Sequence, residues 1–125
     1  MDYVSHVLMH HKRLYRYHKQ HHLKIVPTYA DTYVGHILEG PIQSLGACIP
    51  FLWWNYSVYE ILIILAFLNI RGMMRHDSRF IFLIGNHHLL HHKYPNYNFG
   101  EYWIDSICGT KYPGTREYTP GLIYL

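Results

Sequence analysis

The chain has 125 residues, of which 50% are apolar, 17% are aromatic and only 15% are charged. Average chains carry about 25% charged residues, so this composition excludes a disordered chain and a very polar surface. The formal net charge of +3 is too small to indicate a nucleic-acid-binding protein, and the widely separated Cys48 and Cys108 argue against a disulfide framework or a thiolate zinc site.

The first segment, 2–23, contains neither Gly nor Pro and carries apolar residues at helical spacing, which predicts a single helix. Pro27 indicates where this helix ends. A polar connector follows over 28–40 and contains His36. Because residues 1–17 are polar and rich in histidine, we expect no signal or transit peptide.

Residues 41–70 form a strongly apolar segment, and a membrane-spanning helix needs about 20 such residues. A single span over 49–70 would place the histidine-rich segments on opposite sides of a bilayer, whereas two full spans need about 40 residues. A re-entrant helical hairpin fits the length, with Pro50 or residues 53–55 near its bend. The buried helix of a soluble domain is the alternative. We therefore expect a membrane hairpin over 41–70, followed by a second histidine-rich segment.

Histidine, which makes up twelve residues of the chain, recurs at helical spacing in one HxxxH and two HxxHH motifs. Because residues i, i+3 and i+4 lie on one helical face, each HxxHH motif is expected to present its imidazoles in one direction. His36 and His76 start polar stretches near the ends of the apolar segment and are further candidates, while His11 and His87 are adjacent extras. The eight histidines that we expect to form one dinuclear metal site are His6, His10, His18, His21, His22, His88, His91 and His92.

Neutral imidazole is a ligand for zinc, copper, iron and nickel, and eight imidazoles are enough for two ions. A structural zinc site would recruit cysteine, and a soluble di-iron bundle would carry Glu-x-x-His, which this chain lacks. A zinc hydrolase would place a general-base Glu among its ligands, but no histidine motif contains one. Metal-bound imidazoles usually need a partner for the second ring nitrogen, and the acidic candidates are Glu39, Asp77 and Asp105.

At these residues the chain resembles the fatty acid hydroxylase/sterol desaturase superfamily, whose pattern is HxxxH, HxxHH, a hydrophobic hairpin and HxxHH. LYRYHKQHHLKIVPT at 14–28 is similar to the family's LYxxxHKxHHxxxxPT. HLLHHKYPNYNFGEYWIDSICGT at 88–110 is similar to HxxHH…NFG…WxDxxFGT, with Cys108 in place of Phe. His36 and Glu39 fall where the family often has HPxE. The resemblance covers nearly the whole chain.

The resemblance implies an all-α, membrane-associated fold and a single partial catalytic domain over 1–125, with the hairpin between two histidine-rich helices. It implies an oxygen-dependent di-iron oxidoreductase that hydroxylates or desaturates a fatty acyl chain or a sterol in lipid biosynthesis. His36 and His76 join the eight motif histidines as ligands, no further catalytic or cofactor-binding residue is expected, and zinc could replace the two irons in a purified form. Electrons would come from a cytochrome b-type carrier or a reductase. The expected location is a membrane, entered as a multi-pass or re-entrant protein, and in a eukaryote the endoplasmic reticulum.

The family usually places two or more membrane helices before the first histidine motif, whereas His6 here lies five residues after Met1. We therefore expect the catalytic part without the family's N-terminal helices. It would be a truncated reading frame, one part of a split gene, or a reduced form that borrows membrane helices from a partner chain. The alternative is a non-catalytic metal-binding fragment or a partner subunit of a full-length homologue.

Overall fold

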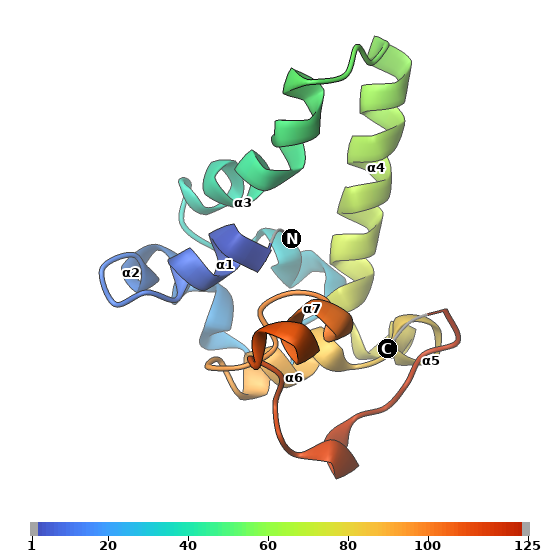
Figure 1. Ribbon diagram of the computed structural model, residues 1–125. Helices are drawn as coiled ribbons and strands as arrows, with labels where there is room; N and C mark the ends of the chain where they lie inside the picture. Colours follow the sequence, from blue (N-terminus) through green and yellow to red (C-terminus); the bar gives the residue numbers. More distant parts are fainter. Residues whose placement is uncertain (1–2, 124–125) are drawn as a thin grey trace.

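The computed structural model describes residues 3–123, without the side chains of residues 45 and 47, and within this range it is helical and contains no strand (Figure 1). The all-α prediction is therefore confirmed for the described residues. The α-helices are α1 (Tyr3–Met9), α2 (Tyr15–His18), α3 (Glu39–Cys48), α4 (Val58–Arg75), α5 (Ile81–Ile84), α6 (His87–Lys93) and α7 (Tyr102–Cys108). Short 3-10 helices cover His21–Leu23, Tyr29–Tyr33, Ile49–Leu52, Ser78–Phe80 and Thr115–Glu117.

The prediction of one helix over 2–23 is wrong. The chain turns between α1 and α2 and ends this region in the 3-10 helix His21–Leu23. In one continuous helix, a rise of about 1.5 Å per residue would separate His6 from His18 by roughly 18 Å along the axis. Their Nε2 atoms lie 3.2 Å apart, which requires the chain to reverse direction.

The apolar segment forms two helices, α3 and α4, which rise together from the body of the molecule and are joined at their far ends (Figure 1). The break between them covers residues 49–57, so a single continuous helix over 49–70 is excluded. Ser57 begins α4 through a capping box, because its hydroxyl accepts from the Glu60 amide and its own amide donates to Glu60 Oε2. The helix runs past the apolar stretch to Arg75, which brings His76 into the body.

No helix in the described part of the chain combines the length and the apolar character needed to cross a membrane.

Polar side chains fill the interior of the body. The buried hydrophobic side chains of residues 3–123 are Met9, Leu90 and Phe99, and histidines, carboxylates, Asn98 and Arg75 account for most of the other buried side chains. Burying so many polar groups is unfavourable unless each one is paired. This interior therefore requires partners for its imidazoles.

Candidate metal centre

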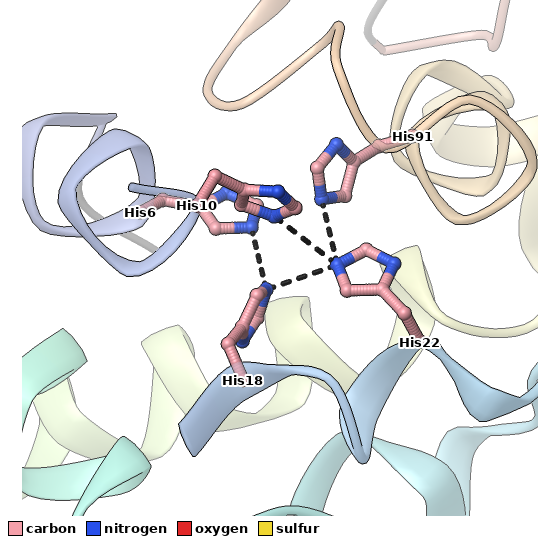
Figure 2. Close-up of side chains that lie close together, drawn as sticks. All are labelled: His6, His10, His18, His22 and His91. Atoms are coloured by element: carbon pink, nitrogen blue, oxygen red, sulfur yellow. Dashed lines mark hydrogen bonds between the residues drawn. The ribbon is translucent and has the colours of Figure 1, made fainter. Parts of the chain in front are cut away.

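Nine histidines converge in two clusters, each with one nitrogen per residue lying within 4.8 Å of the others. Figure 2 shows the first cluster, whose rings reach inward from α1, α2, the 3-10 helix after it, and α6. We call the two groups the first and second clusters. The first consists of His6, His10, His18, His22 and His91, and the second consists of His21, His76, His88 and His92.

The two clusters are adjacent, because each HxxHH motif contributes histidines to both of them. His18 and His22 enter the first cluster while His21 enters the second. The second motif does the reverse: its first and last histidines, at 88 and 92, enter the second cluster and His91 enters the first. The expectation that each motif points all its rings in one direction is therefore corrected. Helical residues i+3 and i+4 are about 100° apart, and this angle lets neighbouring histidines serve different clusters.

Most of the clustered rings are held by acceptors on their Nδ1 atoms. A carbonyl or carboxylate can only accept, so each of these Nδ1 atoms carries the proton and leaves a lone pair on Nε2. In the first cluster His6 donates to Phe99 O, His18 to Glu39 Oε1 at 2.8 Å and His91 to Tyr97 O at 2.6 Å. In the second cluster His21 donates to Val34 O at 3.3 Å, His76 to Gly72 O at 2.7 Å and His92 to Lys24 O at 3.2 Å.

The Nε2 atoms face one another at distances that suit a shared cation. His6 Nε2 lies 3.2 Å from that of His18, and His21 Nε2 lies 2.8 Å from that of His76, although all four rings hold their protons on Nδ1. Two such lone pairs repel each other unless a cation lies between them. With metal–nitrogen bonds of about 2.0–2.1 Å, adjacent ligands are about 3.0 Å apart in square geometry and about 3.4 Å apart in tetrahedral geometry. The donor set and its spacing fit one metal ion per cluster.

Lowered pKa values keep most of the clustered imidazoles neutral, as metal binding requires. Burial, followed by repulsion from neighbouring imidazoles, lowers the pKa of His10 to about 3. The same two causes lower the pKa of His76 to about 3 and that of His92 to about 2. Burial also lowers the pKa of each of four others, namely His6, His22, His88 and His91.

The loop between α6 and α7 contacts the first cluster through backbone carbonyls, and Asp105 fixes the conformation of this loop. The buried carboxylate accepts from the Phe99 amide at 3.0 Å, the Gly100 amide at 2.9 Å, the Thr110 hydroxyl at 2.6 Å and His87 Nε2 at 2.9 Å. Burial opposes ionisation, but these hydrogen bonds outweigh it and lower the pKa of Asp105. The Phe99 carbonyl, fixed in this way, accepts from His6.

The backbone conformation of this loop explains the Asn and the Gly of its NFG sequence. Asn98 adopts a positive φ of 60°, a conformation that Asn tolerates better than most residues. Its side chain donates to His87 O at 3.1 Å and accepts from the Tyr112 amide at 2.8 Å. A Cβ at position 100 would lie 2.9 Å from the Tyr3 ring, so Gly100 allows α1 to approach.

Three candidate histidines lie outside both clusters. His36 packs against the Tyr17 ring, with centroids 4.9 Å apart, and accepts from the Leu38 amide. His11 is exposed, and His87 is buried against Asp105. By contrast, His76 lies where the sequence reasoning expected it, among the ligand candidates.

The acidic candidates take different positions. Glu39 contacts His18, Asp105 contacts His87, and Asp77 accepts from Arg79 and the Tyr29 amide. The backbone carbonyls that hold most of the Nδ1 protons could not be found from the sequence, because any residue can supply a carbonyl.

A cavity of about 510 Å³ lies between α3 and α4 and reaches the second cluster. Its upper part is lined by Cys48, Pro50, Ile64 and Leu68, and its lower end by residues that include His76 and His88. A cavity of this size accommodates a drug-sized apolar molecule.

The fold and the two clusters define a helical, histidine-rich protein with two groups of imidazoles that could each hold a metal ion, beside a largely apolar cavity. Residues 1–110 match the model of the fatty acid hydroxylase family, and the chain belongs to that family.

Among its relatives, human lathosterol oxidase is 35% identical over 137 residues, which cover 98% of this chain and 45% of that protein. A Delta(7)-sterol 5(6)-desaturase of Schizosaccharomyces pombe is 31% identical over 116 residues, which cover 86% of this chain and 35% of that protein. The corresponding enzyme of Saccharomyces cerevisiae is 31% identical over 109 residues, which cover 80% of this chain and 29% of that protein. The chain thus spans less than half the length of these relatives. No solved structure matches the chain.

Proposed function

We propose that this chain forms the catalytic core of a di-iron, oxygen-dependent oxidoreductase that acts on a sterol or a related lipid. The observation that carries the proposal is the convergence of nine histidines in two clusters whose Nε2 lone pairs face one another. All nine ligands are nitrogen donors, a set that iron accepts. Iron bound there would supply the oxygen activation that attack on an unactivated C–H bond requires.

The chain's own residues would place the lipid and keep water away. The cavity between α3 and α4 is lined by Ile64, Leu65 and Leu68 along α4 and ends at His76 and His88. An apolar substrate in this cavity would therefore present its reacting carbon beside the second cluster. Desaturation would remove two hydrogen atoms from the substrate and, with two electrons and two protons from a carrier, reduce O2 to two waters.

The relatives favour a sterol over an acyl chain, since their names describe sterol desaturation and oxidation. Electrons would come from a separate cytochrome b-type carrier or a reductase. Hydroxylation of the same carbon is the alternative outcome of the same chemistry.

The helical hairpin is proposed to enter a lipid bilayer. At its tip Leu52, Trp53, Trp54 and Tyr59 are exposed by 65–79%, and Trp and Tyr are enriched at membrane interfaces. A flotation assay with phospholipid vesicles tests this: Trp54→Glu should reduce the floating fraction, while Trp103→Glu, an exposed Trp outside the hairpin, should not. Purification of the chain as a monodisperse monomer without detergent would contradict the membrane proposal.

Turnover tests the catalytic proposal. The chain, purified in detergent and loaded with iron, is given lathosterol, a reductase and a reduced nicotinamide cofactor, and the sterols are analysed by mass spectrometry. We expect a product two hydrogens lighter, or one oxygen heavier, that forms only with O2 and is lost in His22→Ala and His88→Ala. Metal binding without turnover would favour the non-catalytic subunit, and turnover without metal would contradict the proposal.

A further inference from the structure

Glu39, at the start of α3, faces both metal clusters. Its side chain is buried, and Oε1 accepts from His18 Nδ1 at 2.8 Å and from Gln43 Nε2 at 2.9 Å. The same oxygen lies 3.7 Å from His21 Nδ1. The rings of His18 and His21 stack with centroids 5.1 Å apart, and they belong to different clusters. One carboxylate oxygen therefore lies beside one ligand candidate of each cluster.

This contact differs in charge from the other supports of the clusters. Within residues 3–123, the other hydrogen-bond partners of Nδ1 in the clustered histidines are neutral backbone carbonyls. The carboxylate of Asp105 contacts His87, which is in neither cluster. A carboxylate partner fixes the tautomer of a ligating imidazole and strengthens it as a donor. Glu39 also supplies a negative charge next to two sites built only from neutral nitrogen ligands.

The chain leaves room for this carboxylate at Gly35. A Cβ at that position would lie 2.0 Å from Glu39 Oε2 and 2.9 Å from Cδ, far inside contact distance. The connector therefore packs against the carboxylate through a residue without a side chain. Gly35→Ala would displace the carboxylate while leaving its charge in the chain.

We propose that Glu39 is a positioning residue that couples the two metal sites, because one oxygen accepts from His18 of the first cluster and places its charge 3.7 Å from His21 Nδ1 of the second. Gly35 is the residue that permits this placement. The inference rests on the proposed function, because it assumes that both clusters bind metal.

Cobalt(II) titration of the detergent-purified chain tests the proposal, with the visible absorption of bound cobalt as the readout. We expect Glu39→Gln to weaken cobalt binding at the first cluster by about 10–100-fold, to weaken it less at the second, and to change the absorption bands. Gly35→Ala should also weaken cobalt binding, although it leaves the charge of Glu39 in the chain. Glu117→Gln is the matched control, since the Glu117 carboxylate accepts from Lys93, Tyr94 and Tyr112 rather than from a clustered histidine. This variant should bind cobalt as the wild type does.

The possible outcomes separate this inference from the proposed function. If the wild type binds two cobalt ions and both Glu39→Gln and Gly35→Ala change affinity by less than about threefold, the role of Glu39 is refuted and the metal centre stands. An effect confined to the first cluster would refute the coupling. A lower free energy of unfolding with unchanged cobalt affinity and absorption would reduce Glu39 to a structural role and overturn the proposal. A wild type that binds no cobalt would remove the metal centre and both proposals together.

Discussion

At the scale of single residues, the position of one proton decides what each histidine can do. A ring whose Nδ1 proton is held by a carbonyl has its Nε2 lone pair free for a metal, as in His76, which donates to Gly72 O. A ring outside the clusters lacks this arrangement, as in His36, whose Nδ1 accepts from the Leu38 amide. The sequence predicts both residues as ligand candidates, with His76 ahead of His36, and in the structure His76 alone of the two lies in a cluster.

Replacing these two histidines measures that difference. His76→Ala should remove one of the four ligands of the second cluster and lower the metal content by about one ion per chain, since four-coordinate sites need every ligand. His36→Ala should leave the metal content unchanged. The measurement is elemental analysis of purified protein, and equal loss in both variants would contradict the assignment.

Asp105 supports the first cluster through the loop that it organises. Asp105→Asn keeps the size of the side chain but replaces one acceptor oxygen with an NH2 group that faces donors. Because the carboxylate accepts four hydrogen bonds in a buried position, we expect the free energy of unfolding to fall by about 2–4 kcal/mol. Chemical denaturation checks this value, and a loss below about 1 kcal/mol would show that the loop holds without the charge.

The lowered histidine pKa values predict how the metal-free protein responds to acid. An unfolded histidine takes up a proton near pH 6.5, whereas folded His10 and His76 do so only at about pH 3. Between these pH values the unfolded state binds more protons than the folded state. The stabilisation that the neutral imidazoles contribute is therefore complete above pH 6.5 and is lost as the pH falls toward 3. The urea midpoint of the metal-free chain should therefore drop steadily below pH 6.5. A midpoint that stays constant from pH 7.5 to 4.5 would be incompatible with buried neutral imidazoles.

At the scale of elements, the sequence predicted the hairpin better than the N-terminal helix. The hairpin is predicted from the length of one apolar segment and from Pro50 or residues 53–55 near its bend, which are local signals. The turn between α1 and α2 has no such signal, because residues 2–23 have good helix propensity. It is imposed by the need to bring His6 and His18 together, and tertiary contacts of this kind override local propensity.

The same distinction applies to the site. The eight motif histidines could be found from spacing, and His76 from its place after the apolar segment. Their division between two clusters could not, because it depends on how two separate motifs cross in space. The carbonyl partners of the rings were also invisible, since the backbone of every residue looks alike in a sequence.

The cavity between α3 and α4 can be filled without touching the clusters. Leu68 lines the cavity one turn or more above His76, so Leu68→Trp should obstruct the substrate while the metal content stays at the wild-type value. Misplacement of a reacting carbon by about 1 Å can cost about 100-fold in rate, and we expect a loss of at least about tenfold. Sterol turnover and elemental analysis of the same sample check this. Unchanged turnover would move the substrate site elsewhere.

At the scale of the whole molecule, the interior is built around its imidazoles. Met9, Leu90 and Phe99 are too few to form an ordinary hydrophobic core, and many large apolar side chains along α4 face outward. Folding therefore depends on satisfying the clustered nitrogens, and in such proteins the free energy of metal binding is also free energy of folding.

Each cluster is proposed to hold its own metal ion, and counting the ions bound to the intact chain tests this directly. Native mass spectrometry of the detergent-purified protein should show two bound metal ions per chain. His88→Ala, which leaves three imidazoles in the second cluster, should lower the number to about one. The double variant His18→Ala/His22→Ala, which leaves three imidazoles in the first cluster, should do the same. A wild-type chain that binds one ion or none at saturating iron would contradict the account.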